Sequence, residues 1–319
     1  MNPVPEVVTV GETMAALRAT GPIRLGAPME LSVAGAEATV AIGLARLGHR
    51  AEWVGRVGDD EFGALVLRTL RAEQVGVAHV RVDRDGRPTG LLAREQRIGD
   101  LVRVSYHRAG SAGSALRPEE VLPALRAGVR VLHLTGITPA LAPPAAEAVL
   151  AAARRARELG ATVCLDVNYR ARLWSTERAR EVLVPLARLA DLLVASAEEL
   201  ALVCAEPVAD EPSAIAELLA RGCREVVVTR GGDGASVSTA AGTVAVPARR
   251  VPVVDVVGAG DAFVAGYLSG LLDGLAPAER LHRATLTGAF AVAGRGDWEH
   301  LPNRAELALL DQPAGTTLR

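Results

Sequence analysis

The stretch Asp255-Val256-Val257-Gly258-Ala259-Gly260-Asp261-Ala262-Phe263-Val264-Ala265-Gly266 places a glycine turn directly before a predicted helix. Two glycines around Ala259 allow a tight turn, and the apolar residues of 262–272 have helical spacing. Free N–H groups at such a helix start attract an anion. Asp261 would repel that anion unless it takes a proton from a neighbouring hydroxyl. The stretch therefore predicts a phosphoryl-transfer site with Asp261 as its base.

Two other phosphate-binding motifs do not fit the residues of this turn. A dinucleotide-binding G-x-G-x-x-G loop that starts at Gly258 would need glycine at position 263, where the chain has Phe263. A P-loop needs a lysine on the phosphates, and all 35 basic residues of this chain are arginine. A purely structural turn also fits the motif, because an acidic residue in the first helical turn complements the helix dipole by about 0.3–1 kcal/mol.

Composition and charge narrow the class of protein. With 319 residues, 50% of them hydrophobic, the chain can bury a large core, and we expect one domain over 1–319. A formal net charge of −2 and the lack of a long apolar stretch give no reason to expect a nucleic-acid or membrane partner. The N-terminal residues lack a secretion-signal pattern, so a cytoplasmic enzyme is expected. Three cysteines without C-x-x-C spacing argue against a disulfide framework or a zinc site.

Short apolar runs alternate with helical patterns along most of the chain. This repetition predicts an α/β fold with a mainly parallel sheet and helices on both of its faces. The predicted strand and helix pairs are 7–10 with 36–47, 51–57 with 61–73, 129–134 with 145–159, 162–167 with 179–189, and 191–194 with 197–203. A further strand is predicted at 225–229, and a helical pair at 259–272 and 277–293.

Two segments interrupt the alternation. Residues from about 13 to 34 and from about 88 to 108 are rich in Gly, Pro and Arg, and they contain short alternating runs. Such runs predict additional strands outside the main sheet. We expect these strands to form a small β lid over the edge of the sheet.

Three motifs together resemble those of the ribokinase-like (PfkB) carbohydrate kinases. They are the glycine turn, the pattern Gly-Ala-Glu-x-x-x-Ala-x-x-Leu-x-x-Leu-Gly from Gly35, and Gly55-Arg56-Val57-Gly58-Asp59-Asp60. The resemblance runs nearly end to end. It is strongest to the 2-keto-3-deoxygluconate kinases of that family, through Gly11-Glu12 and the segments 106–114, 135–139 and 166–174. It implies a ribokinase-like fold and the ATP-dependent phosphorylation of the terminal hydroxyl of a keto-deoxy sugar acid.

The resemblance also assigns substrate contacts, and the chemistry of the residues agrees with it. A planar guanidinium is the side chain best shaped to hold a carboxylate, which makes Arg108 and Arg170 the candidates for binding a sugar acid. Each arginine could also be solvated or paired with a surface carboxylate. The implied substrate-binding residues are Gly35, Tyr106, Arg108, Ile137, Arg170 and Asp261.

Two positions depart from the family pattern. Thr39 stands where many members have an Asn that contacts sugar hydroxyls, and a hydroxyl has a shorter reach than an amide. Leu92 stands near the position where relatives have an aromatic residue in the lid. These changes leave a neutral-ketose kinase, such as a fructokinase, as the alternative function. A sugar-binding regulator and a dehydrogenase are more remote alternatives.

For ATP, the resemblance points to Ser196-x-x-Glu199 and to the glycines that follow Thr229. Glu199 would organise hydrated Mg²⁺, although an acid at a helix start is also ordinary, and the glycines could equally form a hairpin turn. The implied catalytic residues are Gly258, Ala259, Gly260 and Asp261, and the implied nucleotide-binding residues are Ser196, Thr229, Arg230, Gly231, Gly234, Gly258 and Gly260. Adenine contacts are expected between 249 and 296. A homo-oligomer is expected, and a monovalent-cation requirement is left open.

Overall fold

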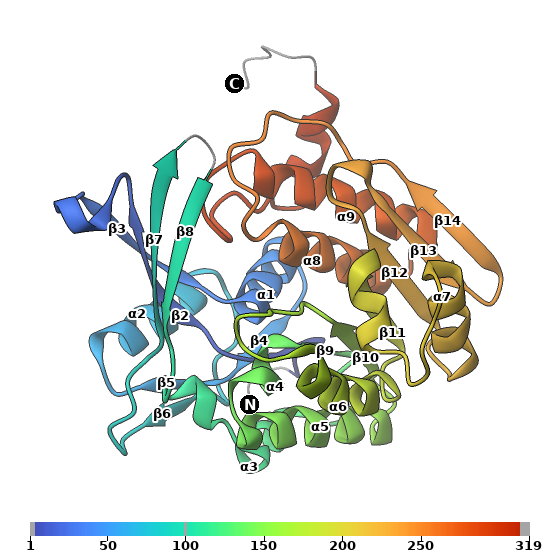
Figure 1. The fold of residues 1–319 in the computed structure, drawn as a ribbon, viewed down its shortest axis with the longest axis horizontal. Coiled ribbons are helices and arrows are strands. Elements are labelled where there is room, and N and C mark those ends of the chain that lie inside the picture. Colours follow the sequence, from blue (N-terminus) through green and yellow to red (C-terminus); the bar gives the residue numbers. More distant parts are fainter. Residues whose placement is uncertain (1–3, 99–100, 313–319) are drawn as a thin grey trace.

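An eight-stranded sheet forms the centre of the protein in the computed structural model, which describes residues 4–98 and 101–312 (Figure 1). Its strand order is β14-β13-β12-β11-β10-β9-β1-β4. Every pair from β12 to β4 is parallel, whereas β13 and β14 are antiparallel additions at one edge. The strands are β1 (Val7–Val10), β4 (Ala51–Val54), β9 (Val131–Thr135), β10 (Thr162–Asp166), β11 (Leu192–Ser196), β12 (Glu225–Thr229), β13 (Ala235–Thr239) and β14 (Gly242–Val246). The mainly parallel sheet predicted from the sequence is confirmed.

Helices cover both faces of this sheet because neighbouring residues of each central strand point to opposite sides and both sides are apolar. Val7 of β1, for example, packs on one side and Val8 on the other. One side carries α1 (Ala36–Arg46), α2 (Glu61–Ala72), α8 (Ala259–Leu272) and α9 (Pro277–Val292). The other carries α3 (Pro118–Val121), α4 (Ile137–Leu141), α5 (Pro143–Glu158), α6 (Thr176–Ala187) and α7 (Glu211–Ala220). The described part contains no helix long and apolar enough to cross a bilayer.

A separate four-stranded sheet, which we call the lid, stands at one side of the central sheet (Figure 1). Its order is β3-β2-β7-β8, with β2 (Met14–Ala19), β3 (Met29–Ala34), β7 (Leu91–Ile98) and β8 (Leu101–His107). The strands predicted within 13–34 and 88–108 are therefore confirmed. Residues 99–100 lie outside the described residues.

Several elements differ from the sequence prediction. The single strand expected over 51–57 is divided, and β5 (Arg56–Gly58) pairs instead with β6 (Arg81–Asp83). Gly55 makes the break, because a Cβ atom there would lie 2.3 Å from the Trp53 ring and 2.4 Å from the Gly11 carbonyl oxygen. The helix expected over 197–203 is a 3₁₀ helix, η4 (Ala197–Leu202). The other 3₁₀ helices are η1 (Ile23–Leu25), η2 (Gly113–Ala115), η3 (Leu122–Ala124), η5 (Gly231–Asp233) and η6 (Glu306–Asp311).

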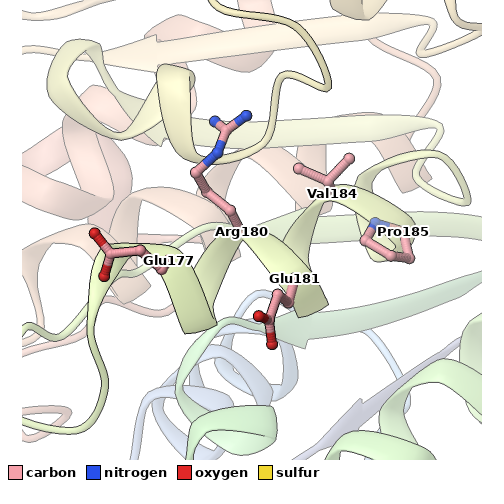
Figure 2. A pocket seen from close by; sticks show the side chains of 5 residues that line it. All are labelled: Glu177, Arg180, Glu181, Val184 and Pro185. Atoms are coloured by element: carbon pink, nitrogen blue, oxygen red, sulfur yellow. The ribbon is translucent and has the colours of Figure 1, made fainter.

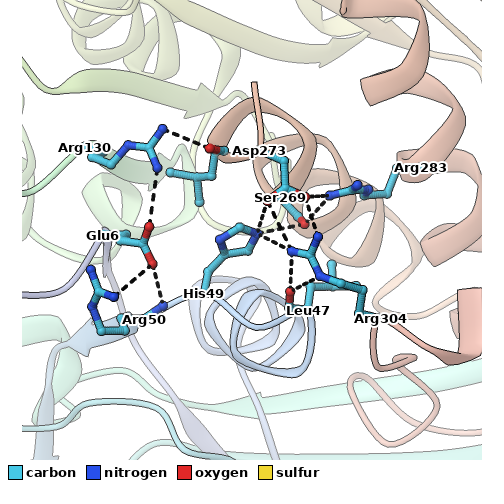
Figure 3. Close-up of polar contacts among 10 residues, drawn as sticks. Glu6, Leu47, His49, Arg50, Arg130, Ser269, Asp273, Arg283 and Arg304 are labelled. Carbon is cyan, nitrogen blue, oxygen red and sulfur yellow. Dashed lines mark hydrogen bonds and ion pairs between the residues drawn. The ribbon is translucent and has the colours of Figure 1, made fainter. Parts of the chain in front are cut away.

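Figure 3 shows a polar network at the amino ends of the parallel strands. Glu6, just before β1, pairs with Arg130, just before β9, at 3.4 Å. Nearby, the Asp273 carboxylate after α8 accepts hydrogen bonds of 2.5 Å from both Arg283 and Arg304. These contacts tie the C-terminal segment to the helices, and they lie at the edge of the sheet opposite to the carboxyl ends of the strands.

A row of buried polar side chains crosses the side of the sheet that α1 covers. Trp53, Thr9, His133 and Cys164 stand in register on β4, β1, β9 and β10. All four are fully buried. Both ring nitrogens of His133 lack a hydrogen-bond partner among the described residues. Burial therefore lowers the pKa of His133 to about 3, and the imidazole is neutral in the folded protein.

We predict that His133 makes the folded state less stable in acid. Its folded pKa of about 3 lies below the ordinary value of 6.5, so below pH 6.5 the unfolded chain binds a proton that the folded protein excludes. From pH 8 to pH 5 this costs about 2 kcal/mol, at about 1.4 kcal/mol for each pH unit below 6.5. In urea unfolding, the free energy of unfolding of His133→Leu relative to wild type should therefore be about 2 kcal/mol more favourable at pH 5 than at pH 8. An equal difference at both pH values would contradict the assignment, and the exposed His107 changed to Leu is the control.

Candidate active site

A pocket of about 670 Å³ lies at the carboxyl ends of the strands, between the lid and the start of α8. This is where open parallel sheets bind ligands. Its wall combines residues of the lid, the start of α1, the loop after β10 and the glycine turn. The site residues predicted from the sequence that line it are Gly35, Tyr106, Arg108, Ile137, Arg170, Glu199, Thr229, Gly258, Gly260 and Asp261.

The remaining predicted residues do not line this pocket. They are Ser196, Arg230, Gly231, Gly234 and Ala259. Arg230 is engaged elsewhere: it pairs with Glu211 at the start of α7, and its Nη1 donates to Ser236 Oγ at 2.9 Å. The glycines after Thr229 form the turn of the β12–β13 hairpin, as the alternative interpretation expected.

The glycine turn is shaped by close contact with the chain after α9. Gly258 has a φ of 75°, and a Cβ atom there would lie 2.2 Å from the Asp297 carbonyl oxygen. A side chain at 258 is thus excluded both by backbone conformation and by space. Gly260, in contrast, faces open space. The structure gives no partner within the described residues to the amides of Gly260 and Asp261, which remain free for an anion.

Asp261 is partly exposed at the base of the pocket. Burial, followed by the nearby Asp166 carboxylate, raises its pKa well above the ordinary value, while Arg170 opposes that rise. The side-chain amide of Asn168 lies 3.5 Å from Asp261 Oδ1. Asn168 itself has a positive φ of 39°, which turns the chain back after β10. The carboxyl group is therefore poised to exchange a proton with a bound hydroxyl.

Two aspartates in the pocket, Asp166 and Asp297, were not predicted as site residues. Asp166 ends β10, and burial followed by the charge of Glu199 raises its pKa to about 7. Asp297 follows α9, and burial followed by the charge of Glu299 raises its pKa to about 7. The sequence signal for Asp166 was its place at the end of a parallel strand. Asp297 had no such signal, because only the packing of α9 brings it to the glycine turn.

Arg108 is held by a buried carboxylate that sequence analysis missed. Glu12 accepts hydrogen bonds from Arg108 Nε at 2.7 Å and from Ser111 Oγ, and its oxygen lies 2.5 Å from Arg108 Nη2. Gly90 and Gly113 make room for this side chain, since a Cβ atom at either would lie within 3 Å of it. The Glu12 pair fixes one edge of the guanidinium and cancels its charge, so Arg108 is not an isolated cation.

Arg170 and Arg172 differ from Arg108 because both are exposed at the pocket mouth. Arg170 Nη1 donates to the Tyr169 carbonyl oxygen at 3.2 Å. Arg172 Nη1 donates to the Val104 carbonyl oxygen of lid strand β8 at 3.2 Å. Neither forms an ion pair in the described part of the chain. Arg172 was not predicted as a site residue, although it lies two positions after Arg170.

The floor of the pocket near α1 contains Glu37, which accepts hydrogen bonds from Thr135 Oγ1 at 2.6 Å and Thr138 Oγ1 at 2.7 Å. Burial raises its pKa despite these bonds. The two positions that depart from the family pattern behave differently. Thr39 is buried without lining the pocket, whereas Leu92 forms part of the wall.

Glu199 binds backbone amides of neighbouring segments. Its carboxylate accepts hydrogen bonds from the amides of Tyr169 at 2.7 Å and Ser196 at 2.8 Å, which is a capping box at the start of η4. It also lines the pocket. No cluster of three or more His, Cys, Asp or Glu side chains that could bind a metal occurs in residues 4–98 and 101–312. A divalent cation here would need oxygen ligands from phosphate and water.

A second hollow lies on the surface of α6, shown in Figure 2, and it lacks these features. Its residues are Glu177, Arg180, Glu181, Val184 and Pro185. Arg180 points away from Glu181 and donates to the carbonyl oxygens of Ala201 and Cys204. That side chain completes the end of η4, which indicates a structural role.

Proteins of similar sequence are carbohydrate kinases. The profile of the pfkB family carbohydrate kinases matches residues 4–304. A 2-dehydro-3-deoxygluconokinase from Bacillus subtilis strain 168 is 36% identical over 308 residues, which are 95% of this chain and 94% of the relative. A fructokinase from Klebsiella pneumoniae is 37% identical over 281 residues, which are 86% of this chain and 90% of the relative.

Solved structures give the same result. A candidate ribokinase II from E. coli in complex with ATP and Mg²⁺ has a TM-score of 0.88 at 25% identity, with 96% of this chain and 99% of that chain covered. A 2-dehydro-3-deoxygluconokinase from Thermotoga maritima has a TM-score of 0.85 at 28% identity, with 95% and 97% covered. A fructokinase variant from Vibrio cholerae O395, bound to fructose, ADP and potassium ion, has a TM-score of 0.81 at 28% identity, with 97% and 99% covered.

The chain thus matches the family profile over nearly its whole length. It also has a pocket under the lid that contains Asp261 beside the free amides of the glycine turn. The chain belongs to the pfkB family of carbohydrate kinases, and it is a sugar kinase with a ribokinase-like α/β fold.

Proposed function

We propose that this kinase transfers the γ-phosphoryl group of ATP to the terminal hydroxyl of 2-keto-3-deoxygluconate, also called 2-dehydro-3-deoxygluconate. One observation carries the proposal: a single pocket contains Asp261 beside the free amides of the glycine turn and, at its mouth, arginines that form no ion pair within the described residues. The 36% identity to the Bacillus subtilis 2-dehydro-3-deoxygluconokinase supports the choice of sugar acid.

Recognition of the substrate carboxylate falls to the arginines. Arg108 is oriented by Glu12 through Nε and Nη2, which leaves Nη1 for a ligand. Arg170 supplies a positive charge that forms no ion pair within the described residues, and its guanidinium fork suits a carboxylate. Gly35, Tyr106 and Ile137 line the same pocket and would contact the sugar chain.

In the transfer step, Asp261 takes the proton of the attacking hydroxyl while the new O–P bond forms and the bond to ADP breaks. The free amides of Gly260 and Asp261, on the turn set by Gly258 and Ala259, stabilise the negative charge on the transferred group. The raised pKa of Asp261 makes it a stronger base than an ordinary carboxylate.

The nucleotide would lie between the glycine turn and the β12–β13 hairpin, with Thr229 in the pocket and Ser196, Gly231 and Gly234 near it. Arg230 could reach a phosphate only by leaving Glu211. The pocket fits hydrated Mg²⁺, because Glu199 is one carboxylate available beside the phosphate site and this ion retains most of its waters. When bound, Mg²⁺ neutralises phosphate charge. We also propose a monovalent-cation effect, a homo-oligomer and, since ATP is the phosphoryl donor, a cytoplasmic location.

A neutral-ketose kinase is the second candidate function. Leu92 favours it, because an aliphatic wall cannot donate a hydrogen bond to a carboxylate or keto group. The fructokinase relative from Klebsiella pneumoniae is of comparable identity over a shorter part of the chain.

We expect Asp261→Asn to keep the fold and ATP binding but to lower turnover by about 10²-fold to 10⁴-fold, the usual contribution of a positioned base. The amide preserves the shape of the carboxyl group but cannot take a proton. Turnover is to be measured as ADP release at saturating sugar acid. A variant that keeps more than about a tenth of wild-type turnover would remove Asp261 from this role.

The pH dependence of kcat/KM should show an acid limb well above pH 3.8, because Asp261 must be ionised to accept the proton and its pKa is raised. Asp166→Asn removes a neighbouring negative charge, so the limb should move to lower pH. Arg170→Met removes a positive charge, so the limb should move to higher pH. The pH at which the limb falls does not depend on the absolute rate. Identical limbs in wild type, Asp166→Asn and Arg170→Met would show that these two charges do not affect the pKa of Asp261.

Substrate class is tested with Arg170→Met, which keeps much of the apolar stem but removes the charged fork. The loss of a charge-assisted contact costs about 1.5–3 kcal/mol, so kcat/KM for 2-keto-3-deoxygluconate should fall roughly tenfold or more. Fructose lacks the carboxylate, and its kcat/KM should change little. If wild type prefers fructose, or if both substrates lose activity equally, the neutral-ketose function replaces the sugar-acid function.

A further inference from the structure

An ion pair joins the lid to the segment that begins the glycine turn. Arg94, on lid strand β7, donates from Nη1 to Asp255 Oδ2 at 2.5 Å and from Nη2 to Asp255 Oδ1 at 2.6 Å. The pair is well shielded, with 14% of the Arg94 side chain and 4% of the Asp255 side chain exposed. A bidentate contact of this kind is strong and specifies the orientation of both groups.

Asp255 also binds two backbone amides next to the glycine turn. We call residues 257–261, together with the segment 296–297 that packs on them, the phosphate cradle. Its Oδ1 accepts from the amide of Val257 at 3.1 Å, and its Oδ2 accepts from the amide of Gly296 at 3.3 Å. Val257 immediately precedes Gly258. Gly296 immediately precedes Asp297, whose carbonyl oxygen packs against Gly258. Each carboxylate oxygen therefore accepts one bond from the lid and one bond from the cradle.

The positive charge of Arg94 stabilises the ionised form of the Asp255 carboxylate. Burial alone would raise the pKa of Asp255, but the hydrogen bonds from Arg94, Val257 and Gly296 lower it below its ordinary value. Without Arg94, a buried anion would stand beside the site that receives phosphate, and nothing else in the described residues forms an ion pair with it. Such an uncompensated charge is costly, and it would be relieved by movement of the loop.

We propose that Arg94 is a positioning residue that couples closure of the lid to the geometry of the phosphate cradle, acting through Asp255. When the lid is closed, Arg94 fixes the Asp255 carboxylate, and Asp255 fixes the amides of Val257 and Gly296. When the lid opens, this support is withdrawn and the cradle loosens. The role of Arg94 in turnover rests on the proposed function, whereas its effect on the backbone at Val257 and Gly296 does not.

A second lid contact shows what is particular to Arg94. Arg18, directly opposite Arg94 on strand β2, pairs with Glu299, which also accepts a hydrogen bond from Ser32 Oγ at 2.6 Å. Glu299 accepts no described bond from residues 256–261. The Arg18–Glu299 pair packs against Gly296 but makes no described hydrogen bond to residues 255–261, whereas Arg94 binds Asp255 directly.

Hydrogen exchange on the ligand-free protein tests the structural half of the proposal. In Arg94→Met, the amides of Val257 and Gly296 should exchange at least about tenfold faster than in wild type, because the acceptor that protects them is no longer fixed. Arg103→Met is the matched control: Arg103 lies in the same lid on β8, is exposed, and faces Glu95 rather than the cradle. Unchanged exchange at both amides in Arg94→Met would overturn the proposal.

Kinetics tests the functional half. Arg94 does not line the pocket, so Arg94→Met should lower kcat about tenfold while the KM for sugar acid changes less than about threefold. Arg94→Lys, which keeps a point charge, should recover part of the loss, and Arg103→Met should match wild type. A general packing defect would instead lower the melting temperature without rescue by lysine.

A double-mutant cycle with Asp255→Asn decides whether Arg94 acts through Asp255. If it does, the double variant should be no slower than the slower single variant. Losses that multiply would show that Arg94 acts independently and would overturn the proposal. If no sugar is phosphorylated by wild type, the proposed function fails, and the exchange experiment still decides whether Arg94 holds the cradle.

Discussion

The crowding of carboxylates around the candidate active-site pocket is the constraint on which the rest of the site depends. Asp166, Asp261 and Asp297 line the pocket together, and each has its pKa raised, chiefly by burial. In the proposed reaction a phosphate and a sugar acid enter this pocket, which is unfavourable unless positive charge is supplied close by. The amino end of α8 and the arginines at the pocket mouth supply it, and the protonated fraction of the carboxyl groups lowers the repulsion further.

The parallel core could be predicted because the signal is local. Each central strand is a short run of aliphatic residues buried on both faces, so its existence and approximate bounds follow from the residues of that strand alone. The division of the segment 51–57 could not be predicted, because it depends on the close approach of the Trp53 ring and of Gly11, the residue after β1, to Gly55. Helix α7 was overlooked although Asp210, its N-cap, is a recognisable start signal.

The same distinction separates the predicted parts of the site from the missed ones. The glycine turn and Asp261 are encoded within a few residues, and their place in the pocket was predicted from those residues. The contacts that position other groups join distant segments: Glu12 meets Arg108 across 96 positions, and Arg94 meets Asp255 across 161. A sequence pattern shows that an arginine is present but not which acid it will find, so the pairing of Arg108 with Glu12 required the three-dimensional arrangement.

The contact between Gly258 and the Asp297 carbonyl has a consequence for the order of folding. Between these residues the chain runs out along α8 and back along α9, and the two helices approach closely at Gly266, where a Cβ atom would lie 2.8 Å from the Ala284 Cα. The turn can take its final shape only after this helical hairpin has closed. During synthesis, a nascent chain that has already released the turn from the ribosome still lacks the segment that completes it. Phosphoryl-transfer chemistry is therefore withheld until the C-terminal part of the protein has emerged and packed.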